Sequence, residues 1–224
     1  MKKILFVINT MGQAGAETAF LDFLKKMDGS EYELSLYILM GQGEMIGKLP
    51  SNIRILNRSL SSLSVLTSQG RRKMALTVFH AFWRHGNCCG KLYSIVQSFA
   101  DMAKAKRIQS SKLFWRVLSD GAQRFETEFD LAVAWLEGGA AYYVADHVNA
   151  RRKAAFIHTD YKNAGYTRNM DKGCWEQFDR IFTVSEQMKG HFQAFYPEYE
   201  EKVFVFNNHI DQDTLLLRAK EPGG

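Results

Sequence analysis

The chain has 224 residues, and 46% of them are hydrophobic, which excludes a disordered chain and allows one large domain or two small ones. Its three cysteines, Cys88, Cys89 and Cys174, contain no CxxC pair, which argues against a structural zinc site and favours a reducing compartment. The net charge is +5, but this charge is unevenly spread.

Positive charge is concentrated in one part of the chain. Residues 71–116 hold ten Lys/Arg and one acid, a net charge of +9, whereas the remainder holds 19 basic and 23 acidic residues, a net charge of −4. The apolar run 4–8 is too short for a signal peptide, and no window approaches the ~20 apolar residues of a membrane-spanning helix. We therefore expect a cytoplasmic protein whose basic character is local.

Short apolar runs followed by helical patterns recur along the chain. They predict strands within 4–8, 32–39, 53–56, 129–139, 152–160, 180–184 and 201–208. Strands that alternate with helices are typical of a parallel sheet covered on both faces. The sequence therefore predicts an α/β, doubly wound (Rossmann-like) domain with a mostly parallel sheet.

Strand signals vanish between about residues 59 and 128, where we expect a helical insertion. Three segments have helical patterns, 71–86, 91–109 and 112–129, and they are separated by residues 87–90 and by Ser110-Ser111.

The first strand runs into a glycine-containing corner, ILFVINTMGQAGAETAFLDFL. Ligands of open α/β sheets collect beyond the carboxyl ends of the strands, where amides at helix N-termini favour anions. Gly12 and Gly15 let main chain approach a ligand, and Glu17 suits the positive first turn of a helix. The alternative is a tight turn with no ligand. The spacing is not G-x-G-x-x-G, and no acidic residue ends the second strand, so a dinucleotide site is disfavoured.

Five segments together resemble one family. GQAGAETAFLDFLKKM is similar to the first glycine-rich loop and helix of GT-B glycosyltransferases of the large retaining family GT4. FDLAVAWLEGGAAYYVAD, KAAFIHTDYKNAGY, FDRIFTVSEQMKGHF and VFVFNNHID resemble successive strand ends of the same N-terminal domain, in the family's order. The likeness is strongest to bacterial members that build surface polysaccharides, and it is weakest from 59 to 128.

The resemblance implies a two-domain enzyme. Residues 1–206 would form the acceptor-side Rossmann-like domain, and residues 207–224 would lead as a hinge toward a donor-binding domain absent from this chain. That second domain uses two glutamates eight positions apart, and no such pair occurs here. We expect this part alone to be inactive, with a nucleotide sugar and a glycan, commonly lipid-linked, as the substrates of the whole.

Two residues at strand ends are the catalytic candidates that the resemblance implies. His158 matches a histidine that lies against the transferred sugar, where it can hydrogen-bond a hydroxyl or steady positive charge at the anomeric carbon; the alternative is a satisfied structural histidine. Glu137 stands where Leu-Glu-Gly recurs in the relatives and could grip an acceptor hydroxyl or cap a helix.

The resemblance also implies substrate-binding groups. Gly12, Gly15, Ala16 and Glu17 match the loop that reaches toward the donor phosphates. Asp160, Tyr161 and Ser185 complete the predicted set: Asp160 as an acceptor-hydroxyl ligand or an Asx-turn, Tyr161 as a ligand or a surface aromatic, and Ser185 as a family strand-end serine or a plain N-cap.

We expect neither a metal nor a cofactor. Asp211-Gln212-Asp213 has the form of the Asp-x-Asp that binds Mn²⁺ in another glycosyltransferase architecture, but it falls at the expected hinge with no second ligand cluster evident.

The cationic segment carries many aromatic residues, and this combination suits anionic lipid headgroups. The alternative is a solvated face over core aromatics, and no nucleic-acid-binding module is recognisable. The residues of this predicted basic face are Arg71, Arg72, Lys73, Arg84, Lys104, Lys106, Arg107, Lys112 and Arg116. A peripheral position on the inner face of the plasma membrane follows. Two rival functions stay open: a non-catalytic module that docks on a membrane or a partner, and one subunit of a two-chain glycosyltransferase.

Overall fold

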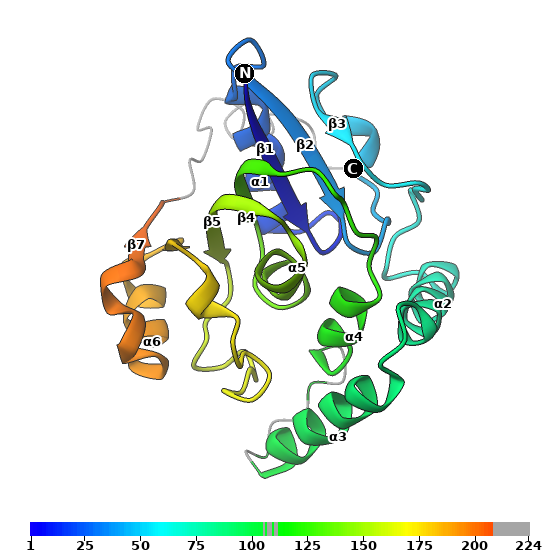
Figure 1. Ribbon diagram of the computed structural model, residues 1–224, viewed down its shortest axis with the longest axis vertical. Helices are drawn as coiled ribbons and strands as arrows, with labels where there is room; N and C mark the ends of the chain where they lie inside the picture. The colour runs from blue at the N-terminus through cyan, green and yellow to red at the C-terminus, as the bar shows by residue number, and fades with distance from the viewer. Residues whose placement is uncertain (105, 107–108, 110–111, 208–224) are drawn as a thin grey trace, which may run out of the picture.

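A computed structural model describes residues 1–207 except 105, 107–108 and 110–111. It contains one seven-stranded sheet in the order β3-β2-β1-β4-β5-β6-β7, and every neighbouring pair is parallel (Figure 1). The strands are β1 (Lys2–Ile8), β2 (Tyr32–Ile38), β3 (Arg54–Ile55), β4 (Phe129–Ala134), β5 (Ala150–Ile157), β6 (Arg180–Thr183) and β7 (Val203–Val205). The predicted α/β, Rossmann-like fold is confirmed, and the sheet is wholly rather than mostly parallel.

Helices cover both faces of this sheet. They are α1 (Gly15–Lys26), α2 (Ser68–Trp83), α3 (Cys88–Lys104), α4 (Trp115–Asp120), α5 (Gly139–His147) and α6 (Glu186–Phe195). Short 3₁₀ segments, η1 (Ile46–Lys48), η3 (Trp175–Gln177) and η4 (Pro197–Lys202), lie in the connections.

The alternation of side chains along β1 separates two cores. Ile4, Phe6 and Ile8 pack on the side of α1, whereas Leu5 and Val7 pack on the side of α5. In Figure 1, α5 lies in front of the sheet and α1 behind it. Both faces are buried, which explains why the strands read as continuous apolar runs.

The order in which successive strands are added to the sheet reverses between β1 and β4. The strands β1, β2 and β3 follow one another toward one edge, and β4 to β7 follow one another toward the other. Crossovers of one hand then place α1 and α5 on opposite faces, and the strand order reverses between the carboxyl ends of β1 and β4. This is the place where ligands bind in sheets of this kind.

The helical insertion is present, but its third helix is much shorter than predicted. Within 112–129 only α4 (Trp115–Asp120) is helical. It ends at Gly121, where a Cβ atom would lie 2.2 Å from the Ala81 carbonyl oxygen. The next residues are held by tertiary contacts, such as the hydrogen bond that the Gln123 backbone N–H donates to the Tyr37 hydroxyl. Apolar spacing alone could not reveal this packing against α2.

Segment 160–178 contains a buried carboxylate. Asp171 is only 3% exposed and accepts hydrogen bonds from the hydroxyls of Tyr142, Tyr161 and Tyr196, at 2.6, 2.8 and 2.8 Å. These contacts tie α5 and α6 to the long connection after β5. Within the described ranges, no helix is long and apolar enough to span a bilayer.

Candidate functional site

The carboxyl ends of β1 and β4 are joined by the side chain of Asn9. Its Nδ2 donates to the Glu137 carbonyl oxygen at 3.1 Å, and its Oδ1 accepts from the Ala140 amide at 2.7 Å. Two glycines permit this approach, since a Cβ on Gly139 would lie 2.9 Å from Asn9 Oδ1, and Gly138 has a φ of 75°. The turn after β4 is therefore held against the end of β1.

Glu137 and His158 are direct neighbours across the ends of β4 and β5. The Glu137 carboxylate is 4% exposed, and its Oε2 accepts the His158 backbone N–H at 2.9 Å. The glutamate thus positions the loop that carries the histidine, whichever further role it has.

His158 is half-buried against aromatic rings. Its ring centroid lies 5.5 Å from that of Trp135 and 6.2 Å from that of Phe156. Burial lowers the pKa of His158 to about 4, although a hydrogen bond with the Trp135 backbone acts in the opposite direction. At neutral pH the imidazole is therefore uncharged. Its Nε2 and the neighbouring Thr159 Oγ1 are buried without a hydrogen-bond partner among the described residues.

The glycine-containing corner adjoins the same group. The Trp135 indole N–H donates to the Ala16 carbonyl oxygen at 2.9 Å, so the first turn of α1 is fixed to the end of β4. Residues 16, 137 and 158 are thus connected through Trp135 and the Glu137–His158 hydrogen bond. Gly15, the residue before Ala16, is exposed and has no atom within 4 Å of its Cβ position.

Carboxylates surround Gly12. A Cβ there would lie 3.8 Å from Glu44 Oε2 and 4.0 Å from Glu17 Oε1. Glu17 points inward and accepts from the Thr10 hydroxyl at 3.2 Å, and burial raises its pKa, to which the nearby charges of Glu137 and Glu44 add. This local charge opposes a phosphate directly at Gly12, so the anion-binding role predicted for Gly12 and Glu17 is not what these contacts favour. Hydroxyl groups are the better match.

The remaining predicted substrate ligands differ in placement. Asp160 Oδ1 accepts from the Lys162 amide and lies 2.7 Å from His191 Nδ1, which is the Asx-turn alternative with a histidine partner. Ser185 caps α6, since its Oγ accepts from the Met188 amide at 3.2 Å. Tyr161 is not a surface aromatic: it is 2% exposed and its hydroxyl donates to Asp171 in the core, a placement that does not favour the predicted ligand role.

Two cations of the predicted basic face connect the helical insertion to another segment of the chain. Lys112 Nζ donates to the Ala164 carbonyl oxygen and lies over the Tyr166 ring. Arg116 donates to the Met170 and Lys172 carbonyl oxygens, at 2.9 and 2.7 Å, and pairs with Asp146. They join the insertion to residues 164–172, so they are removed from the face. Arg71, Arg72, Arg84, Lys104 and Lys106 are exposed, Lys73 is half-buried, and Arg107 lies outside the described residues.

Helices α2 and α3 expose large apolar side chains, whose positions composition alone could not indicate. Large apolar side chains project from both, with exposed fractions of 62% for Trp83 and 65% for Tyr93. We call these residues the apolar face; its members are Leu76, Phe79, Trp83, Leu92, Tyr93, Val96 and Phe99. A different set on α2, including Met74, Val78 and Ala81, packs against the core. Each helix is therefore apolar on two sides.

Sequence reasoning missed three residues of the site: Asn9, Trp135 and Glu44. Asn9 and Trp135 follow buried strands directly, a position that is itself a usable signal. Glu44 lies in a loop, and only the fold brings it to Gly12.

No group of three or more His, Cys, Asp or Glu side chains in the described part of the chain could hold a metal ion. No model of a known protein family matches the chain, and no curated protein sequence matches it.

Proposed function

We propose that this chain is the acceptor-binding half of a retaining, metal-independent GT-B glycosyltransferase, which moves a sugar from a nucleotide-sugar donor to a bacterial glycan. The donor-binding half would be supplied by a second domain or a second polypeptide. The resemblance of five strand-end segments to GT4 enzymes motivates this assignment.

The observation that carries the proposal is that Ala16, Glu137 and His158, which follow β1, β4 and β5, are linked at one edge of the sheet. Trp135 binds the Ala16 carbonyl oxygen and lies beside the His158 ring, and Glu137 accepts the His158 amide. A carboxylate and a neutral imidazole suit recognition of sugar hydroxyls, because each can accept a hydrogen bond. His158 Nε2 and Thr159 Oγ1 are buried and make no hydrogen bond within the described part of the chain, so both can bind a further group. Gly15, which is exposed and begins α1, would face the donor phosphates, on the outer side of the carboxylates near Gly12.

Replacing His158 with alanine tests the assignment. We expect sugar transfer to fall about 100-fold, which corresponds to about 2.7 kcal/mol of transition-state stabilisation. The measurement is incorporation of labelled sugar into lipid-extractable glycan by membranes from cells that express the intact gene, supplied with labelled UDP-, GDP- and TDP-sugars. Glu137→Gln, which keeps an acceptor for the His158 amide but removes the charge, separates a chemical role from loop positioning.

The matched control is His147→Ala at the end of α5, since this helix runs back from the carboxyl edge and its histidine contacts Asp120 and Arg124. We expect transfer by this variant to stay within about twofold of the parent. Unchanged transfer by His158→Ala, with the variant folded, would sink the site assignment.

A second candidate function is docking on an anionic membrane, and the apolar face favours it. Contiguous exposed apolar residues mark interaction surfaces in soluble proteins. The positive charge around this face favours an anionic membrane over a second copy of the chain. Asp101 is the one acid between residues 71 and 116, and the exposed basic residues are Arg71, Arg72, Arg84, Lys104 and Lys106. Two copies placed face to face would oppose like charges, whereas an anionic bilayer attracts each basic residue by about 1 kcal/mol. Trp and Tyr are also enriched at the headgroup level.

Exchanging Phe79, Trp83, Val96 and Phe99 for serine should abolish vesicle binding. We expect at least a tenfold fall in co-sedimentation with phosphatidylglycerol-containing vesicles, since burying each such side chain in an apolar environment is favourable by about 1.5–3 kcal/mol. Phe204→Ser, which removes an exposed phenylalanine of β7, is the control and should bind as the parent does. Equal binding of both proteins, or dimerisation of the parent without vesicles, would contradict membrane docking.

A further inference from the structure

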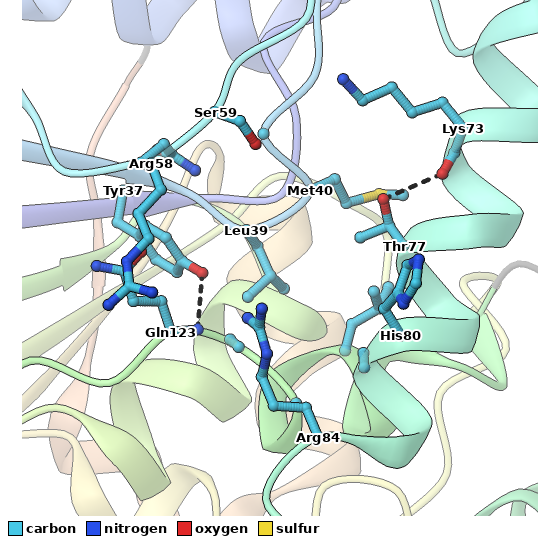
Figure 2. Close-up of a pocket in the computed structure, with 16 residues that line it drawn as sticks. Tyr37, Leu39, Met40, Arg58, Ser59, Lys73, Thr77, His80, Arg84 and Gln123 are labelled. Atoms are coloured by element: carbon cyan, nitrogen blue, oxygen red, sulfur yellow. Dashed lines mark hydrogen bonds between the residues drawn. The ribbon is translucent and has the colours of Figure 1, made fainter.

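A hollow in the molecule is lined by neither Glu137 nor His158. It has a volume of about 260 Å³ and is formed by the ends of β2 and β3, one side of α2 and the turn after α4 (Figure 2). Water occupies about 30 Å³ in the liquid, so the hollow has room for a polyatomic group. We call it the α2 pocket.

Four basic side chains line the α2 pocket. Arg58 comes from the loop after β3, Lys73 and His80 come from α2, and Arg84 is the C-cap of that helix; none of the sixteen lining residues is Asp or Glu. In Figure 2 the guanidinium groups of Arg58 and Arg84 lie on either side of Gln123, and the Ser59 hydroxyl adds a neutral donor. The chemistry of this lining is that of an anion site.

These cations have no counter-charge in the described part of the chain. All ion pairs between described residues involve other side chains. The side chains of Arg58, Lys73 and Arg84 also make no hydrogen bond to any described residue. Lys91 shows what a structural cation looks like here: it is 1% exposed and its Nζ donates to the Ala81, Phe82 and Arg84 carbonyl oxygens. The pocket cations are not used to hold the fold together in this way.

The wall behind them is rigid. Tyr37 is 4% exposed, its hydroxyl accepts the Gln123 amide at 3.1 Å, and burial raises its pKa while the nearby charge of Arg84 opposes that shift. Asn57 exchanges two hydrogen bonds with the backbone of Ile38, at 2.9 and 2.7 Å. Rigid walls with unpaired cations favour binding, because little ordering is needed when an anion enters.

We propose that the α2 pocket binds a phosphate or pyrophosphate group, with Arg58 and Arg84 as its principal donors and Lys73 as a third positive charge. Arginine matches phosphate geometry with paired N–H donors, and such charge-assisted hydrogen bonds are the strong ones. The helix that lines the pocket also carries Leu76, Phe79 and Trp83 of the apolar face, so a phosphate at the headgroup level of a bilayer could reach it. The pocket is independent of the transferase chemistry proposed for His158, and its failure would leave that proposal untouched.

Calorimetric titration of the chain with inorganic pyrophosphate tests the pocket directly. We expect binding by the parent and at least tenfold weaker binding by Arg58→Gln/Arg84→Gln, a change of about 1.4 kcal/mol, since the variant loses two positive charges and their charge-assisted hydrogen bonds. Both arginines are exposed, so the variant should fold, and its thermal melting curve checks this. The control Lys26→Gln/Lys48→Gln removes two exposed charges elsewhere and should bind pyrophosphate as the parent does.

Vesicles distinguish the source of the phosphate. If a lipid headgroup is the ligand, the parent should prefer phosphatidic acid over phosphatidylglycerol at equal surface charge, and pyrophosphate should compete for that preference. If a free phosphate compound is the ligand, pyrophosphate binds and the two lipids are equivalent. Absence of pyrophosphate binding by the parent, or equal binding by the arginine double variant, overturns the proposal.

Discussion

Replacing Asp171 with alanine is expected to lower the free energy of unfolding by about 3–5 kcal/mol, because several buried hydroxyls would lose their shared acceptor. The carboxylate is the shared acceptor of Tyr142, Tyr161 and Tyr196, which are all less than 5% exposed. Without it, three buried hydroxyls lose their acceptor, and each unsatisfied group costs about 1–3 kcal/mol unless water enters.

Urea unfolding followed by circular dichroism measures this change. Tyr161→Phe, which removes one donor and keeps the ring, should cost about 1–2 kcal/mol. The control Asp22→Ala removes an exposed carboxylate whose pair with Lys25 is a surface contact, and it should change stability by less than about 1 kcal/mol. Equal effects of Asp171→Ala and Asp22→Ala would show that the tyrosine cluster does not stabilise the fold.

Replacing Gly43 with alanine should destabilise the protein by about 3–4 kcal/mol, from overpacking together with an unfavourable φ. Gly43 has a φ of +148°, and a Cβ there would lie 2.1 Å from the Met11 carbonyl carbon. The loop after β2 lies directly against the glycine-containing corner, since Met11 N donates to the Gln42 carbonyl oxygen and Met45 N to the Met11 carbonyl oxygen, both at 2.9 Å.

The same unfolding assay measures this effect, and the matched control is Gly190→Ala. Gly190 lies inside α6, is exposed and has no atom within 4 Å of its Cβ position, so alanine should stabilise the helix by about 0.5–1 kcal/mol. Opposite signs for the two glycine-to-alanine changes are the expected result. Equal stability of Gly43→Ala and the parent would show that these two loops do not pack closely against each other.

The apolar face and the α2 pocket lie on different sides of the same helix, α2. Residues such as Phe79 and Trp83 point outward, whereas Lys73, Thr77 and Arg84 line the hollow. A bilayer docked on this side would lie beside the ends of β2 and β3, which belong to the same carboxyl edge as Glu137 and His158. Membrane docking and glycan chemistry are therefore compatible in space, and the three experiments above test them separately.

The sequence by itself determined the alternating strands and helices, because buried parallel strands are continuous apolar runs and the helices between them have apolar spacing. It also indicated which residues follow strand ends: Gly12, Glu137 and His158 were found in this way. The Ser185 N-cap was readable because capping is a local interaction between a side chain and an amide three residues away.

Only the tertiary structure decided the partners of these residues. Lys112 and Arg116 bind carbonyl oxygens more than 50 residues away in the chain, and Asp171 accepts from Tyr142 and Tyr196, 29 and 25 residues away. The shortened α4 and the arginines of the α2 pocket, which have no partner among the described residues, likewise depend on how separate segments pack. Local patterns report which side chains are apolar or charged, but desolvation and hydrogen bonding are set by neighbours that arrive only when distant segments pack together.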